Sequence, residues 1–182
     1  STTVSADNSK VSVTFDQPVY SDDVPNVSTI GTSGTNSFWF PENVSIDSAN
    51  NVIVSDYTNK MIRKITPDGV ITTIATILGT PNDAVADNNG NIYVADNNRH
   101  VILKIDTGGS VSVYAGQIGI PGLVNGPKAS AKFRDPMAIA IDDSENIYVA
   151  DTSNNLIRKI DSTGTVTTFS GGFLGPEGLD FD

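Results

Sequence analysis

Short apolar segments recur along the chain, and turns rich in Asn, Asp, Ser and Gly separate them. In residues 92–95 (Ile-Tyr-Val-Ala) both alternating faces carry apolar side chains, so a strand there must be buried on both faces. Residues 138–142, 146–151, 156–160 and 165–169 are short strand signals linked by tight turns. The pattern predicts units of four antiparallel strands and no helix.

The units repeat at fixed spacing. The hexapeptide Asn-Ile-Tyr-Val-Ala-Asp occurs at residues 91–96 and 146–151, and residues 51–56 (Asn-Val-Ile-Val-Ser-Asp) are a looser copy. A proline and an aspartate precede each copy, namely Pro41, Pro81 and Pro136, and Asp47, Asp87 and Asp142. Both markers are 40 residues apart between the first two copies and 55 between the second and third, which places a 15-residue insertion near residues 117–132.

A four-stranded antiparallel unit of about 40 residues, covered on both faces by its neighbours, is typical of a β-propeller blade. Pro176 and Asp182 repeat the markers 40 residues after the third copy, so we expect a fourth blade to begin there. The expected fold class is all-β, a β-propeller of four-stranded antiparallel blades in an incomplete ring. The expected units are residues 1–37 (N-terminal segment), 38–78 (first blade), 79–131 (second blade with the insertion), 132–172 (third blade) and 173–182 (start of a fourth).

The third copy resembles an NHL repeat. Its motifs are Phe-Arg-Asp-Pro at 133–136, Ile-Ala-Ile-Asp at 139–142, the hexapeptide at 146–151 and Asn-Asn-Leu-Ile-Arg-Lys at 154–159. The resemblance covers residues 38–182, and the insertion is similar to a glycine-rich segment that precedes many bacterial NHL copies in large secreted proteins. It implies a propeller, commonly six-bladed, in a longer bacterial protein that is extracellular or at the cell surface.

Two interpretations of the N-terminal segment remain open. Residues 6–15 align with residues 160–169, which makes residues 11–15 the last strand of a preceding blade. Alternatively, residues 11–20 resemble a strand and corner of bacterial immunoglobulin-like modules. We favour the first interpretation, in which residues 20–37 form a long loop on one propeller face.

Composition narrows the possible functions. The 182 residues include 38% hydrophobic residues, enough for a packed core, and the net charge is −10. Such an acidic chain is not expected to bind nucleic acid or anionic lipid. No apolar stretch is long enough to cross a bilayer. Because there is no cysteine, disulfides and thiolate metal sites are excluded.

Residues with catalytic or metal-binding potential are few. The single histidine, His100, cannot form a multi-histidine zinc site, and we expect it to be a solvent-exposed loop residue. Residues 87–91 carry closely spaced oxygen ligands but fit a hairpin turn better than a calcium loop. The chain has no nucleophile elbow and no phosphate-binding loop. We therefore expect no catalytic residue, no cofactor and no metal. The alternative is a six-bladed lactonase-type or lyase-type enzyme with a metal in its channel.

Several basic residues recur in the third strands, where we expect a solvated face rather than an RNA-binding surface. Asp56 and Asp151, which end second strands, should reach Arg63 and Arg158 diagonally across the hairpin. In the middle copy Leu103 replaces the arginine, so its aspartate must use backbone donors or the loop residue Arg99.

The densest aromatic cluster is Phe-Trp-Phe at residues 38–40. Phe38 aligns with Phe133 and is predicted to be core, whereas Trp39 and Phe40 align with polar residues of the third copy. These two aromatic residues are the candidate binding site, because exposed aromatic side chains concentrate binding energy. The expected function is a non-catalytic extracellular scaffold or binding module whose partner is a protein or a glycan.

Overall fold

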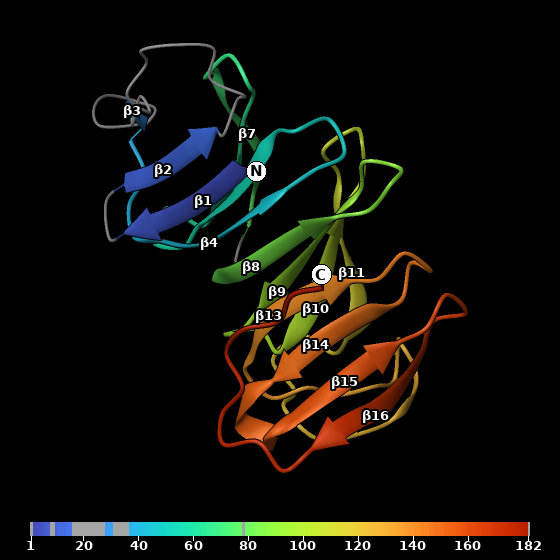
Figure 1. Cartoon of the computed structure of the whole chain (residues 1–182). Coiled ribbons are helices and arrows are strands. Elements are labelled where there is room, and N and C mark those ends of the chain that lie inside the picture. The colour runs from blue at the N-terminus through green and yellow to red at the C-terminus, as the bar shows by residue number, and fades with distance from the viewer. Residues whose placement is uncertain (1, 8–9, 16–27, 31–36, 78, 182) are drawn as a thin grey trace.

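The chain forms three antiparallel blades of four strands placed side by side, and a short fifth strand is added to the outer edge of the third (Figure 1). The computed structural model describes residues 2–7, 10–15, 28–30, 37–77 and 79–181, and side chains from residue 37 onward. In the described residues the one helical element is a single 3₁₀ turn, Thr152–Asn154. The all-β prediction and the prediction of four-stranded blades are both confirmed.

Each blade is a meander whose strands follow chain order from the inside outward. The first blade contains β4 (Pro41–Ile46), β5 (Val52–Asp56), β6 (Met61–Ile65) and β7 (Ile71–Thr76). The second contains β8 (Pro81–Ala86), β9 (Ile92–Asp96), β10 (Val101–Ile105) and β11 (Val111–Gly116). The third contains β13 (Pro136–Ile141), β14 (Ile147–Asp151), β15 (Leu156–Ile160) and β16 (Thr165–Gly171).

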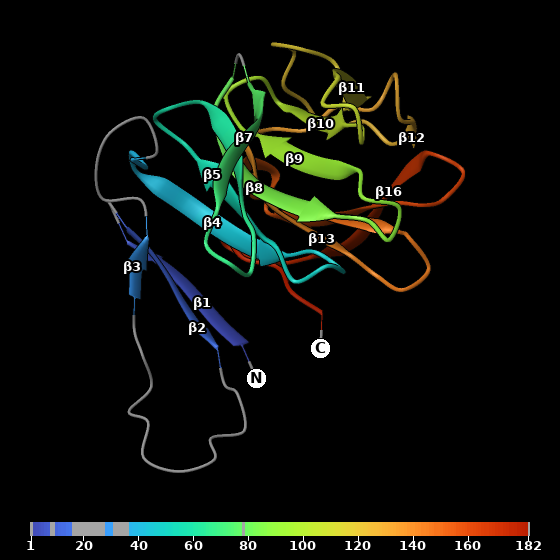
Figure 2. The same cartoon turned by 90° about the horizontal axis from the view of Figure 1, so that it is seen from above.

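The hydrophobic core lies between the blades. All five residues of β5, β9 and β14 are buried, as the two-sided apolar pattern predicted. Tyr93 and Ala95 of the second blade pack with Phe133, Ile139 and Val149 of the third. A second cluster joins the first and second blades in the same way. Stacking of blades therefore buries the second strands, and the inner strands β4, β8 and β13 lie next to one another (Figure 2).

A turn that begins with an aspartate follows each inner strand of the three blades. Asp87 Oδ1 accepts the backbone N–H groups of Asn89 at 2.9 Å and Asn91 at 2.8 Å, and Gly90 between them has a φ of +81°. Equivalent bonds are made by Asp47 and Asp142. These carboxylates replace the backbone partners that a tight turn lacks.

The N-terminal strands form a separate antiparallel sheet. β1 (Thr2–Asp7) pairs with β2 (Lys10–Phe15), which pairs with β3 (Ser28–Ile30). β1 lies beside β4, just as β4 lies beside β8. Residues 11–15 thus belong to a middle strand of this sheet, and its assignment to a preceding blade stays a prediction. The predicted loop 20–37 is wrong for residues 28–30, which form β3, and residues 20–27 and 31–36 lie outside the described part of the chain.

The insertion and the C-terminal segment both contact the third blade. Within the insertion, β12 (Gly126–Pro127) pairs with the outer strand β16. Residues 172–181 form no strand, yet Leu179 packs against Ala138 and Tyr148, and the Phe181 ring meets the Tyr148 ring at 4.9 Å. This segment therefore covers part of the face of the third blade that points away from the second blade.

Candidate functional site

A cavity of about 420 Å³ opens between the inner strands. β4, β8 and β13 each contribute residues, and the C-terminal segment contributes Leu179 and Asp180. The side chains of adjacent inner-strand residues alternate in direction, and the lining mixes polar and aliphatic groups. The described lining residues are Asn43, Val44, Ser45, Ile46, Asp83, Val85, Ile139, Ala140, Ile141, Leu179 and Asp180.

Asp83 is the buried acid of this cavity, with 4% of its surface exposed. Its Oδ1 accepts the backbone N–H of Ala84 at 2.8 Å, and its Oδ2 accepts that of Ile139, on the next blade, at 2.9 Å. Desolvation raises the pKa of Asp83 from 3.8 to about 6, and the nearby charge of Asp180 adds to the increase. The repeat places Asn43 at the same register in the first blade, where its amide oxygen accepts the Val44 N–H.

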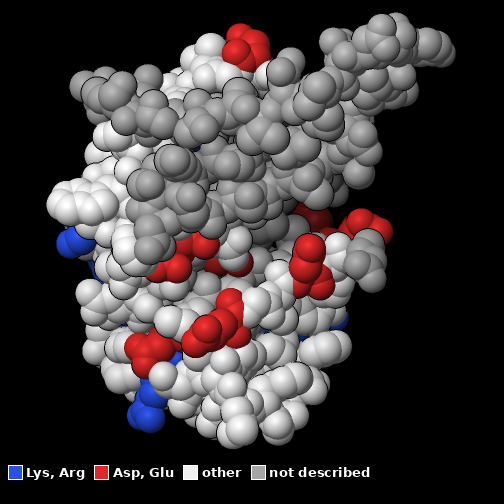
Figure 3. All heavy atoms as spheres, turned by 60° about the vertical axis from the view of Figure 1, so that its left-hand side comes forward, with Lys and Arg blue, Asp and Glu red and all other residues white. Residues whose placement is uncertain are grey.

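A smaller hollow of about 130 Å³ lies where the inner strands begin. It is lined by Asn43 and by the residues that follow the four repeat prolines, namely Glu42, Asn82, Met137 and Glu177. The Oδ1 atom of Asn82 is buried there without a hydrogen-bond partner. Figure 3 shows Asp and Glu side chains gathered on one face of the molecule, with Lys and Arg mainly at its margin. This end of the inner strands is rich in oxygen ligands and negative charge.

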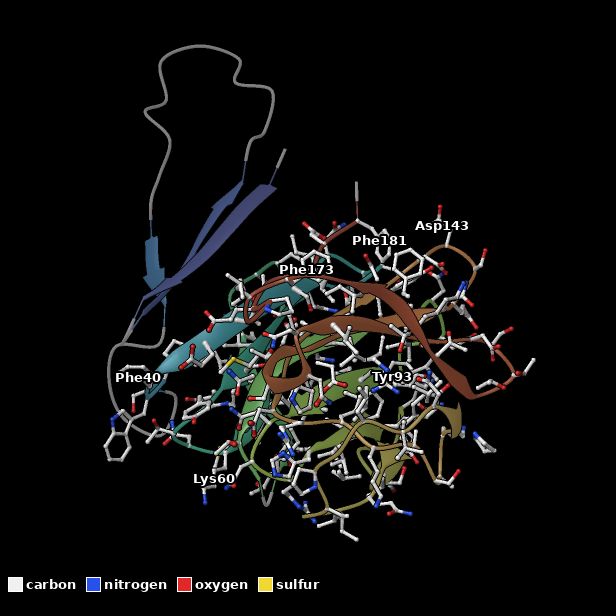
Figure 4. All side chains as sticks on the ribbon, turned by 90° about the horizontal axis from the view of Figure 1, so that it is seen from below. Phe40, Lys60, Tyr93, Asp143, Phe173 and Phe181 are labelled. Atoms are coloured by element: carbon white, nitrogen blue, oxygen red, sulfur yellow. The ribbon has the colours of Figure 1, made fainter. Side chains whose placement is uncertain are left out.

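Trp39 and Phe40, the predicted binding residues, lie on the loop that leads into β4. Their side chains are 62% and 42% exposed, whereas Phe38 is buried as predicted. The backbone around Trp39 is fixed, because its N–H donates to Asp56 Oδ1 at 2.9 Å and its carbonyl accepts the Thr58 N–H at 3.1 Å. Figure 4 shows Phe40 at the periphery of the molecule, far from the interior Tyr93.

Comparison with known proteins identifies the repeat. The NHL repeat family model matches residues 78–105. The chain carries an NHL repeat. No curated protein sequence matches it. The NHL resemblance drawn from the sequence is therefore confirmed, and the matched residues lie in the second blade.

Solved structures show the same propeller fold. An auxiliary nutrient binding protein from Bacteroides thetaiotaomicron is 18% identical, with a TM-score of 0.69 over 95% of this chain and 51% of its own. Virginiamycin B lyase from Staphylococcus aureus is 17% identical, with a TM-score of 0.69 over 95% of this chain and 53% of its own. A gluconolactonase from Xanthomonas campestris is 10% identical, with a TM-score of 0.59 over 72% and 47%. The chain thus spans about half the length of these structures, and the likeness concerns the fold alone.

The first and third blades each contain a buried aspartate–arginine pair. Arg158 Nη1 lies 2.7 Å from Asp151 Oδ2, and Arg63 Nη1 lies 3.4 Å from Asp56 Oδ2, as the spacing predicted. Each guanidinium also lies over a phenylalanine ring, Phe133 at 5.3 Å and Phe38 at 5.5 Å. The expectation that basic residues of the third strands form a solvated face is wrong for these two arginines, which are buried. Their positive charges are neutralised away from the cavity.

The second NHL blade lacks this arginine. Asp96 accepts the Thr80 N–H at 3.1 Å and the Arg99 N–H at 3.3 Å, and the Arg99 guanidinium is 4.0 Å away. Burial raises the pKa of Asp96. These partners are the ones expected from the sequence, because Leu103 stands where the first and third blades have an arginine. The Asp96 carboxylate leaves no space for a side chain at Gly79, because a Cβ atom there would overlap Asp96 Oδ2.

His100 is not the solvent-exposed residue that the sequence suggested. Its side chain is 17% exposed, and Nδ1 accepts the Asp135 backbone N–H at 3.2 Å, beside the Asp135 carboxylate. The histidine therefore bridges the second and third blades. The sequence alone gives no signal for this role, because it depends on how the two blades pack together. Within the described ranges no three His, Cys, Asp or Glu side chains converge to hold a metal ion. In those ranges no helix is long and apolar enough to cross a membrane.

Proposed function

We propose that this chain is a non-catalytic binding module of an extracellular or cell-surface protein, and that it contacts a glycan or a protein partner through Trp39 and Phe40. The observation that supports this proposal is the exposure of both aromatic side chains on a backbone fixed by Asp56 and Thr58. A backbone that is fixed before binding loses little conformational entropy on contact, and aromatic side chains have few rotatable bonds to immobilise. A structural neighbour described as an auxiliary nutrient binding protein is consistent with a binding role.

Phe40 has a backbone conformation that favours a different residue. Its φ is +57°, and the equivalent Asp135 of the third blade has a φ of +50°. Aspartate and asparagine tolerate this left-handed region, whereas a bulky aromatic residue there is strained. Folding alone therefore favours a small polar residue, as in the third blade. An exposed aromatic side chain at a strained position is consistent with selection for binding.

The chain offers a direct optical test, because Trp39 is its single tryptophan. We expect soluble neutral polysaccharides or a peptide library to yield a ligand that shifts the intrinsic fluorescence on titration. Trp39→Ala and Phe40→Asn should each weaken immobilised-ligand binding by about tenfold or more, which corresponds to about 1.4 kcal/mol. Phe40→Asn should keep or raise the melting temperature, since it relieves strain.

Phe169→Ala is the matched control, because Phe169 is 61% exposed on the opposite end of the blade stack. It should bind as tightly as the wild type. Unchanged affinity in both the Trp39 and Phe40 variants would contradict the proposed surface. Turnover of a lactone or of virginiamycin B by the purified protein would instead support the enzyme alternative, since the lyase and the gluconolactonase have the same fold as this chain.

A further inference from the structure

Among the residues whose side chains are described, the cavity between the inner strands is lined by two carboxylates and by no basic group. Asp83 and Asp180 both line it, and none of the described lining residues is basic. The buried arginines Arg63 and Arg158 are instead paired with aspartates of the second strands. A cavity whose described lining is acidic attracts positive charge from solvent.

The surroundings of Asp83 make its negative charge costly. Only two backbone N–H groups stabilise the carboxylate, and it is almost completely buried. Asp180, on the C-terminal segment, is the other charged group that lines the cavity, since the described lining residues of β4 and β13 carry none. Burial and this like charge together hold the pKa of Asp83 at about 6. A bound cation would offset the cost of desolvation by direct attraction and would screen the repulsion from Asp180.

We propose that this cavity binds a small organic cation, a primary ammonium group on a short aliphatic chain, between Asp83 and Asp180. An ammonium group has three donors and can bond both carboxylates while the backbone N–H groups stay on Asp83. Val85, Ile141 and Leu179 provide aliphatic walls for the hydrocarbon part. A small inorganic ion would leave these walls unused, and an anion would face two like charges. The site lies apart from Trp39 and does not depend on the function proposed for that residue.

Binding is coupled to ionisation of Asp83. A cation binds the deprotonated carboxylate, so the proton leaves Asp83 for the buffer as the cation enters. Since about half of the Asp83 carboxyls carry a proton at pH 6, binding at that pH releases roughly half a proton per cation. Affinity falls about tenfold between pH 7.5 and pH 5, where about nine in ten of these carboxyls are protonated.

The experiment compares n-hexylammonium with 1-hexanol and hexanoate, which share the chain but differ in charge, by ligand-observed NMR and calorimetry. A Gly-Lys-Gly peptide tests whether a lysine side chain supplies the same group. We expect hexylammonium or the peptide to bind and the alcohol and hexanoate not to bind. Calorimetry at pH 6 in two buffers of different ionisation enthalpy should report the released proton.

Asp83→Asn and Asp180→Asn should each reduce cation binding at least tenfold, and Asp83→Asn should also abolish the proton release. Asn43, at the equivalent register of the first blade, indicates that an amide fits this position. Asp143→Asn removes the same charge from an exposed turn outside the cavity and should bind like the wild type. Equal binding of hexylammonium and hexanoate, absence of binding by any cation, or retained binding in both cavity variants would overturn the proposal.

Discussion

Replacing Asp83 by asparagine removes a buried charge from the inner strands and almost preserves the side-chain shape. In the folded protein the pKa of Asp83 is about 6, raised from 3.8 chiefly by desolvation. At pH values between 3.8 and about 6, the folded protein binds more protons at this carboxyl than the unfolded chain does. The free energy of unfolding therefore falls as the pH rises from 3.8 through 6, and the stabilisation by the protonated carboxyl is lost above pH 6.

The size of the effect follows from the two pKa values. The full titration corresponds to about 3 kcal/mol. Between pH 8 and pH 5 about 1.4 kcal/mol of this amount is recovered, because the folded carboxyl is then about nine-tenths protonated and the unfolded one is still ionised. For a chain of this length the change corresponds to roughly 3–6 °C in melting temperature.

The assay is a set of thermal and urea melts of the wild type, Asp83→Asn and Asp143→Asn at pH 5 and pH 8. The variant-minus-wild-type difference for Asp83→Asn should be about 1.4 kcal/mol more favourable to the variant at pH 8 than at pH 5. Comparing two pH values cancels the constant cost of altering the bond to the Ile139 N–H. Asp143, on an exposed turn, should show no such change. A difference for Asp83→Asn that is equal at both pH values would refute the account of the buried charge.

Three further substitutions test the packing between and within blades. Val149→Asp should prevent folding as judged by circular dichroism, because Val149 is fully buried between two blades and an unpaired charge there costs several kcal/mol, on the order of 4 or more. Gly79→Ala should lower stability by about 2 kcal/mol in urea melts, because its methyl group would overlap the Asp96 carboxylate. Arg158→Ala should cost about 3–5 kcal/mol and make residues 122–132 more sensitive to limited proteolysis, since this arginine holds the insertion. Melting temperatures within 1 °C of the wild type, on the order of the measurement error, would count against each of these three assignments.

The repeat made the blades predictable from the sequence, because proline, aspartate and the apolar hexapeptide mark the same strands in every copy. The pair between Asp56 and Arg63 was also predictable, since both residues lie within one hairpin. The role of Asp83 was not, because the equivalent positions hold asparagine and alanine, and its second hydrogen bond goes to Ile139 on another blade. The contact of His100 with Asp135 likewise joins two blades, and local spacing contains no signal for it.

The insertion also has a consequence for how the chain opens. Its Lys128 accepts the Gly116 N–H through its carbonyl and donates its own N–H to the Gly164 carbonyl, so one residue bonds to both the second and third blades. Gly126 adds backbone pairing to the outer strand of the third blade. The last strand of the second blade and the outer hairpin of the third are therefore clasped together. We expect these two blades to exchange their amide hydrogens as one cooperative unit, while the first blade, with no such clasp in the described residues, opens independently.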